Sequence, residues 1–201
     1  LLSLLGVDLD ADVIAVSANS TSTGPGTTVN TGTMTVVNLA IAGQSTRNGP
    51  VAANTTINVG LNVLGNDLNI ATIVLNEQVV NGDGSFTVNG VHITLLGGGL
   101  VTSLLGINGG DIMLASATSK AACSSTLPSP SPSPSPDPCT NGEAYGLEAK
   151  VLNLVDIDKV GLSTLPPGGS NSVVGAGIPL LGTLGAINSS ANNTSGGGQT
   201  Q

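Results

Sequence analysis

Residues 73–88 read Ile-Val-Leu-Asn-Glu-Gln-Val-Val-Asn-Gly-Asp-Gly-Ser-Phe-Thr-Val, and this stretch decides the fold class. Its two ends are rich in the β-branched and aromatic side chains that strands favour. Between them, Asn81–Gly84 has the residues that a tight turn with positive φ angles requires. We therefore predict a hairpin in which Ile73–Val80 and Ser85–Val88 are antiparallel neighbours.

The same kind of pattern recurs along the chain. Apolar and polar residues alternate in Met34–Ile41, Ile57–Leu64 and Phe86–Leu95, which places the apolar set on one face of a strand. Glycine-rich turn signals separate these runs at intervals of roughly ten residues. The sequence predicts an all-β, antiparallel, sandwich-like fold. A β-solenoid is the less favoured alternative, because no fixed repeat of about 20 to 30 residues is evident.

The composition argues against catalysis. The 201 residues include one His, one Tyr, one Phe, no Trp and only 8% charged residues, so few side chains can act as acid, base or nucleophile. His92 is alone in sequence, and we interpret it as a structural polar residue. The core must consist of small branched side chains, which brings the layers close together. We predict that the protein is not an enzyme and has no cofactor.

The charge limits the partners. A net charge of −8 with four basic residues lacks the positive footprint that nucleic acids require. No run approaches the about 18 apolar residues of a membrane-spanning helix. Exposed strand edges also lack the lysines that usually discourage pairing with another chain. The sequence therefore has no feature that would prevent strand edges of two copies from pairing.

The chain divides at a tract in which proline alternates with Ser or Asp. Each proline fixes φ and removes a backbone donor, so residues 124–138 are predicted to form an extended linker or loop. On this basis residues 1–123 form the main β domain. Residues 139–187 form a second β segment that packs on the same unit or on the next one, and residues 188–201 form a polar tail or linker.

Cys123 and Cys139 flank this tract and are the only cysteines. In an exported chain a disulfide between them is the first expectation. A fully extended tract would span roughly 30 Å at about 3.1 Å per residue, whereas bridged Cα atoms lie about 6 Å apart. Either the tract bends, or each cysteine pairs elsewhere, or the thiols are free.

Two further sets of residues are candidate sites. Alternating aspartates could bind Ca²⁺ if loop carbonyls joined them, although solvated strand-face acids are commoner. These weak candidates are Asp8, Asp10, Asp12, Asp156 and Asp158. Asn-x-Ser/Thr sequons make several asparagines candidates for glycosylation, although chance explains most of them in so Asn-rich a chain. These are Asn19, Asn54, Asn188, Asn192 and Asn193.

Three pairs of segments share a further likeness, namely Gly142–Leu147 with Leu165–Gly169, Asn54–Ile57 with Val74–Gln78, and Gly84–Ile93 with Asp111–Ala115. They resemble the bacterial family of exported surface proteins called choice-of-anchor P. The resemblance implies an exported β protein without known catalytic residues. The order of the segments is rotated relative to that family, as expected for one frame of a tandem repeat.

The sequence thus predicts a structural subunit of an extracellular filament or cell-surface layer. Copies would join head to tail, by strand addition or as tandem repeats, with Leu1, Leu2, Leu4 and Leu5 in the assembly strand. The alternative is a surface adhesion module that binds carbohydrate, calcium or ice through a flat Thr/Asn face such as Thr27–Thr35.

Overall fold

The computed structural model describes residues 9–24, 27–41, 44–63, 66–96, 109–121, 141–151, 155–165, 170–174, 177–178 and 182–195. These residues form strands joined by turns and contain no helix. The strands are β1 (Leu9–Gly24), β2 (Thr27–Ile41), β3 (Arg47–Pro50), β4 (Thr55–Val63), β5 (Asn66–Val80), β6 (Phe86–Leu95), β7 (Gly110–Lys120), β8 (Asn141–Val151), β9 (Val155–Val160), β10 (Ser163–Leu165), β11 (Ser170–Val174), β12 (Gly177–Ile178) and β13 (Gly182–Ser195).

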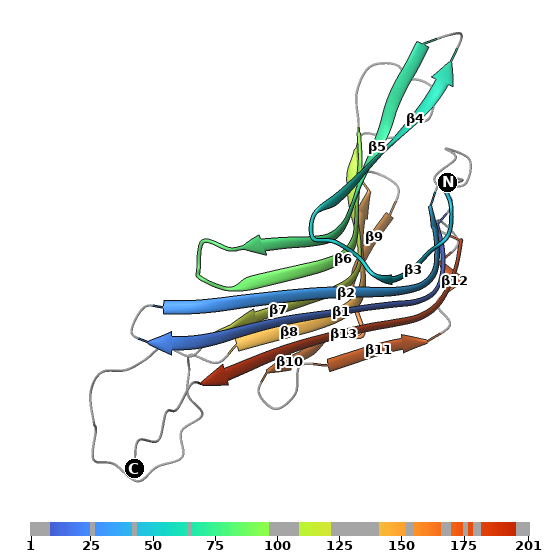
Figure 1. The fold of residues 1–201 in the computed structure, drawn as a ribbon. Coiled ribbons are helices and arrows are strands. Elements are labelled where there is room, and N and C mark those ends of the chain that lie inside the picture. Colours follow the sequence, from blue (N-terminus) through green and yellow to red (C-terminus); the bar gives the residue numbers. More distant parts are fainter. Residues whose placement is uncertain are drawn as a thin grey trace, which may run out of the picture.

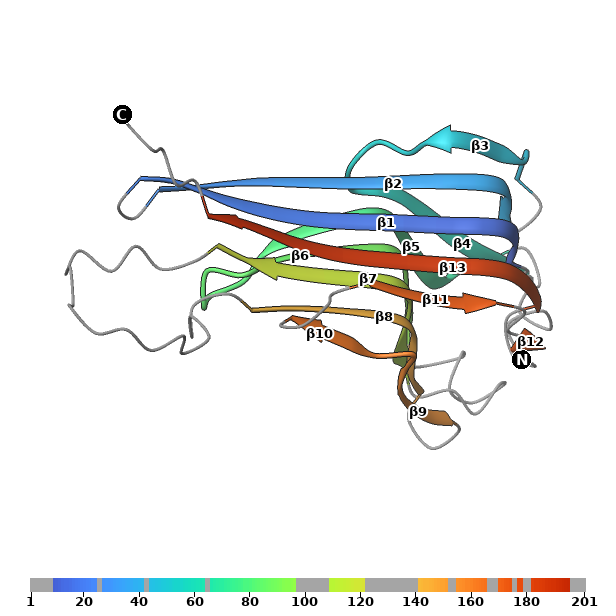
Figure 2. The ribbon, with the colours of Figure 1, turned by 90° about the horizontal axis from the view of Figure 1, so that it is seen from below.

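The strands form two sheets that pack face to face (Figures 1 and 2). The smaller sheet has the order β11-β13-β1-β2-β3, with β12 beside β13, and the larger has the order β10-β8-β7-β6-β5-β4, with β9 beside β8. Every pair is antiparallel except β1 and β13, which run parallel. The predicted all-β, sandwich-like fold is confirmed, and the solenoid alternative is not what forms.

The predicted hairpin forms where the turn residues place it. Val80 pairs with Phe86, and the ladder between β5 and β6 continues to Ala71 and Leu95. Gly84 has a φ of 84°, a conformation that glycine adopts without steric cost. The Asp83 carboxylate accepts hydrogen bonds from the backbone and the hydroxyl of Ser85, which closes the turn.

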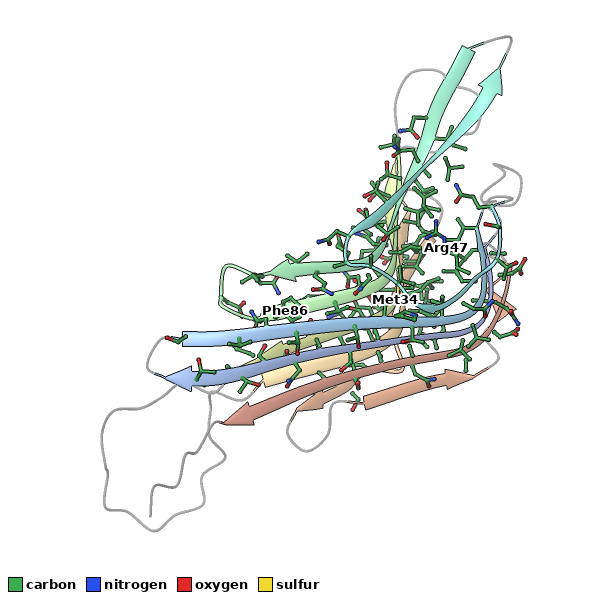
Figure 3. The ribbon with its side chains drawn as sticks, viewed as in Figure 1. Met34, Arg47 and Phe86 are labelled. Atoms are coloured by element: carbon green, nitrogen blue, oxygen red, sulfur yellow. The ribbon has the colours of Figure 1, made fainter. Side chains whose placement is uncertain are left out.

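The core lies between the sheets and is made almost wholly of small branched side chains (Figure 3). Ile14 and Met34 from the smaller sheet face Leu75, Ile93 and Leu114 from the larger one, and all are at most 1% exposed. Buried hydroxyls add polar links between the layers. Ser20 bonds to Ser119 at 2.8 Å, and Ser189 donates to the carbonyl of Tyr145 at 3.0 Å.

Both sheets turn a corner, so the sandwich has two arms (Figure 1). The long arm, horizontal in Figure 1, contains the hairpin turn, and the upright arm contains the β4–β5 ladder. At the corner the alternation of inward-facing residues slips by one position in each long strand. In β6, for example, Phe86 and Val88 are buried before the corner and Val91, Ile93 and Leu95 after it.

The slips occur at the same level in neighbouring strands, so the register is unchanged on both sides. In the larger sheet the register places Asn76, Gly90, Ala115 and Gly146 side by side. In the smaller sheet it places Asn38, Asp12 and Gly185 side by side. Asn38, Asn76 and Ala115 have φ angles of 50–56°, the left-handed region that bulged positions use. A coordinated row of left-handed and glycine positions therefore bends each sheet without breaking its ladders.

The two sheets approach closely at Gly90. A Cβ atom there would lie 2.9 Å from Cγ1 of Val16 and 3.1 Å from Cγ2 of Ile14. Contacts this short force neighbouring atoms to move. Gly90 therefore lets the larger sheet approach β1 at the corner.

The parts of the chain before and after the Ser/Pro tract pack as one unit. The segment after the Ser/Pro tract contributes β8 to the larger sheet and β13 to the smaller one, so it shares one core with residues 9–121. The expected polar tail at 188–201 is wrong for residues 188–195, which complete β13 beside β1. Within this segment Ser189 and Ala191 are buried, whereas Asn188 and Ser190 are half-buried.

Candidate functional site

Polar side chains line the inner side of the corner, on the face of the larger sheet that points away from the core. Asn89, Ser116 and Tyr145 lie in one row across β6, β7 and β8, and they are only 6%, 1% and 4% exposed. A sheet face without a covering layer is normally solvated. The bend buries these side chains by folding the upright arm toward them. We call this row and its neighbours the crease.

Hydrogen bonds run along the crease from one arm to the other. Ser116 donates to Asn89 at 2.7 Å, and Asn89 donates to Oε2 of Glu77 at 2.7 Å. The same Oε2 lies 2.9 Å from Nδ1 of His92, which belongs to the upright arm. Nε2 of His92 lies 3.1 Å from Oδ1 of Asp111. The imidazole is thus held between two carboxylates.

This arrangement favours the imidazolium form of His92. Both ring nitrogens can donate to a carboxylate only when both carry a proton. The hydrogen bond to Glu77 raises the pKa of His92 above its ordinary value of 6.5, against the opposing effect of burial. The same bond lowers the pKa of Glu77 below its ordinary value of 4.5. An imidazolium that donates a hydrogen bond from each ring nitrogen has no free lone pair and cannot act as a base. The role of this hydrogen-bonded chain in the crease is therefore to hold the two arms together.

The partners of His92 were missed from the sequence, although a signal existed. The hairpin turn fixes the register of β5 against β6, and that register places Val74 opposite His92 and Glu77 opposite Asn89. Extending the predicted hairpin by counting would have brought Glu77 near His92. Asp111 lies on β7, and the connection between β6 and β7 is too long for the sequence to indicate how these two strands pair.

The far end of the crease holds the only tyrosine. Burial raises the pKa of Tyr145, and its hydroxyl donates to Sδ of Met113 at 3.6 Å. Nζ of Lys159 lies 4.8 Å above the centre of the ring and also pairs with Glu143. The ring face is therefore already occupied by a cation and offers no open platform for a sugar.

A first hollow, of about 310 Å³, lies near the hairpin turn. It is lined by Asp83, Ser85, Thr118, Lys120, Gly142, Glu143 and Thr164. Its charges already have partners within the protein, because Lys120 pairs with Asp83 at 3.3 Å and Glu143 pairs with Lys159. The bonds from Ser85 lower the pKa of Asp83 to about 2, so this carboxylate stays ionised.

A second hollow, of about 390 Å³, lies beside β3, where the chain passes from the smaller sheet to the larger one. It is lined by Val36, Thr46, Arg47, Asn48, Pro50, Val51, Ala52 and Thr55, and Figure 3 labels Arg47. We call it the Arg47 hollow. Nearby, Val51 donates to the carbonyl of Met34 and accepts from the side chain of Asn76, so its wall is tied to both sheets.

One long strand edge is uncovered. β3 pairs with β2 only from Thr35 to Leu39, so in the described chain the residues Thr27–Thr33 have no strand on the side away from β1. We call Thr27–Thr33 the free edge. The side chain of Gln78 reaches it, and its amide donates to the carbonyl of Gly32 at 3.0 Å. Asn30, within the free edge, has a buried Oδ1 without a hydrogen-bond partner.

The predicted calcium residues do not gather. Asp10 and Asp12 lie on β1, whereas Asp156 and Asp158 lie on β9 in the other sheet, and all four are exposed. Asp12 accepts a 2.5 Å bond from the side chain of Asn38 at the bend, which gives it a structural role. Within the described residues, no three His, Cys, Asp or Glu side chains are grouped so that they could hold a metal ion. Asp8 lies outside these residues.

The sequons fall in two settings. Asn54 is exposed in the turn before β4, and its Oδ1 accepts from the backbone of Gln78 at 2.9 Å. Asn19 and Asn188 are half-buried, and together with Asn192 they lie on strands within the smaller sheet; Asn193 pairs with Ser20. Asn54 is thus the most accessible of those whose side chains the structure describes.

Other predicted residues lie outside the described chain. These are the cysteines Cys123 and Cys139, the Ser/Pro tract, and the assembly leucines Leu1, Leu2, Leu4 and Leu5. Their predicted roles stay predictions. The Thr face expected along Thr27–Thr35 is present, since Thr31, Thr33 and Thr35 alternate with inward residues and are exposed.

Comparisons with known proteins leave the family open. No family model, curated protein or solved structure matches this chain. The resemblance to the choice-of-anchor P family therefore stays a prediction. As for membranes, the described residues include no helix with the length and apolarity needed to cross one.

Proposed function

We propose that this protein is a structural subunit of an extracellular filament or surface layer, and that copies join by adding a strand to the free edge of β2. The observation that carries the proposal is the free edge itself. Exposed edges usually carry lysine, proline or a bulge that prevents pairing with another chain. Thr27–Thr33 has no charged residue and no proline, and its register with β1 is regular from Thr28 to Thr33, with one irregularity between Ser22 and Gly24 opposite Thr27 and Thr28.

The surroundings of the free edge support an added strand. The adjacent end of β5 exposes Val79 and Val80, at 38% and 66%. Val29 on the free edge is 49% exposed. A strand laid along β2 would cover this apolar surface and pair with the open backbone groups. Such a contact joins different surfaces of two copies, so repeated addition gives a fibre.

The predicted donor is the leucine-rich segment at residues 1–5 of another copy, acting either non-covalently or within a tandem chain. In this proposal the polar hydroxyl faces and the small share of charged residues, 8%, let neighbouring units pack through backbone ladders. The proposal includes no enzymatic role, and in support the imidazole of His92 is engaged by a carboxylate on each side.

The proposal is tested by Thr31→Lys. The wild type should associate as its concentration rises, and a lysine at the centre of the free edge should weaken that association at least about tenfold. The matched control is Thr35→Lys, which adds the same charge on the same face where β3 already covers the strand. Light scattering and electron microscopy provide the measurements.

Two outcomes would contradict strand addition at the free edge. One is a wild type that stays monomeric at high concentration. The other is an equal loss of association in Thr31→Lys and Thr35→Lys, since charge alone would then explain the effect.

The second candidate is a surface adhesion module, and one observation favours its carbohydrate form. The described aspartates form no shared calcium site, whereas the Arg47 hollow has polar and apolar groups on its walls.

A further inference from the structure

The basic residues of this chain differ in whether they have acidic partners. The chain has three lysines and one arginine. Lys120 pairs with Asp83, Lys150 with Glu148 and Lys159 with Glu143. Arg47 forms no ion pair and no side-chain hydrogen bond with any described residue. In a protein of net charge −8, the one cation without an acidic partner lies in a hollow.

The walls of the Arg47 hollow limit what can occupy it. A guanidinium presents a planar set of donors that matches a carboxylate in a two-bond arrangement. Thr46, Asn48 and Thr55 add hydroxyl and amide groups, which suit a ligand that also carries hydroxyls. Val36, Pro50 and Val51 supply apolar contact for carbon atoms.

Size and charge narrow the choice further. The volume of about 390 Å³ falls at the small end of ligand pockets, which measure roughly 300–1,000 Å³. One arginine balances one negative charge, so a singly charged ligand fits better than a phosphate with two. A sugar acid combines the three required features, namely one carboxylate, several hydroxyls and an apolar ring face.

We propose that the Arg47 hollow binds a uronic acid residue, with the carboxylate on the guanidinium and the sugar hydroxyls on Thr46, Asn48 and Thr55. The ligand class is therefore an acidic saccharide. The open wall and the lack of an aromatic platform imply weak binding of one residue, with a dissociation constant on the order of 1 mM. Acidic polysaccharides with many such residues would gain from multiple contacts.

This inference is independent of assembly through the free edge. The hollow is bounded by β3 and the segment after it, and β3 covers the part of β2 that the free edge excludes. A Thr31→Lys variant that no longer associates should therefore bind the saccharide as the wild type does.

The test is a titration of the ¹⁵N-labelled protein by two-dimensional NMR with three small probes. Sodium glucuronate carries both carboxylate and hydroxyls, methyl glucoside lacks the carboxylate, and acetate lacks the hydroxyls. Glucuronate should give saturable shifts at the amides of Thr46–Thr55, at least about tenfold tighter than either of the other probes. Equal shifts with acetate would reduce the hollow to a general anion contact, and an absence of saturation with glucuronate would overturn the proposal.

Substitutions at Arg47 separate charge from geometry. Arg47→Met should abolish saturable binding, and Arg47→Lys should weaken it because a lysine keeps the charge but loses the planar donor set. The matched control is Lys150→Met, which removes one positive charge from the exposed, upright part of β8. Unchanged binding in Arg47→Met, or an equal loss in Lys150→Met, would contradict a site at Arg47. Amide spectra report at once whether each variant is folded.

Discussion

At the scale of single residues, the ion pair between His92 and Glu77 joins the two arms in a chain that has few charged residues. His92 belongs to the upright arm, Glu77 belongs to the long arm, and the 2.9 Å bond between them spans the crease. Both side chains are about one-fifth exposed, so solvent screens the pair only in part. Asp111 is half exposed and adds less.

The bond between His92 and Glu77 should make stability depend on pH. The pKa of Glu77 is lowered on folding, so its contribution is complete above about 4.5 and is lost as the pH falls through the lower, folded-state pKa. The pKa of His92 is raised, so its contribution is complete below about 6.5 and is lost as the pH rises through the higher, folded-state pKa. The pair therefore stabilises the fold most between those two values.

We expect His92→Gln to lower the free energy of unfolding by about 1–2 kcal/mol near the middle of that range. The difference should shrink at alkaline pH, once the pH has risen through the raised, folded-state pKa of His92 and the wild-type ring has lost its charge. Urea unfolding of both proteins at each pH measures it. An equal difference at both pH values would show that the contribution of His92 comes from packing alone.

At the scale of strands, the coordinated slip at the corner is the feature that shapes the molecule. Strands with a single bulge normally bend alone and disturb their pairing. Here neighbouring strands slip at the same level, so the ladders on both sides keep one register. The corner is therefore a property of the sheets, and Gly90 at its centre sets how closely they approach.

Gly90→Ala should destabilise the protein by about 1–3 kcal/mol, the usual cost of forcing extra atoms into a filled interior. The added methyl group would meet Val16 and Ile14 of the other sheet. Gly82→Ala is the control, because nothing lies within 4 Å of a Cβ atom in that exposed turn. Thermal unfolding of both variants provides the comparison, and similar melting temperatures would contradict a close approach at Gly90.

Local signals account for what could be predicted at this scale. The Asn81–Gly84 turn chemistry predicted the hairpin, and the alternating runs predicted the strand class. The slip was also visible, since the apolar spacing in Phe86–Leu95 changes phase at Asn89-Gly90. The sequence alone does not identify it, because a glycine within a strand can mark a bulge, a bend or the close approach of another backbone.

Long-range pairing could not be predicted in the same way. β13 joins β1 across most of the chain length, with Ala11 beside Leu184, and no turn between them fixes a register. Its Ser/Asn-rich end was interpreted as a tail because outward polar residues of a strand and residues of a linker have the same composition. Arg47 carried no motif at all. Arg47 stands out only because the three lysines have acidic partners and it has none among the described residues. Those pairings are visible only in the folded chain.

At the scale of the whole molecule, the first and last described strands are neighbours. The smaller sheet is complete only when β13 has reached β1, so a large share of its contacts is distant in sequence. Folds dominated by such contacts form slowly. The same pairing places the start of β1 on the upright arm and the end of β13 at the far end of the long arm (Figure 1).

That parallel pair also determines how the protein resists force. Tension applied at Leu9 and Ser195 pulls the two strands along their length in opposite directions, so the bonds from Ala11–Leu184 to Ser22–Ser195 are strained together in shear. Tension applied at Leu9 and Ile41 would open the antiparallel β1–β2 pair one bond at a time, like a zip. In single-molecule pulling, the first geometry should need several times the force of the second, and equal forces would contradict it. In the fibre that we propose, a unit loaded in shear between β1 and β13 would carry tension without unfolding until that higher force is reached.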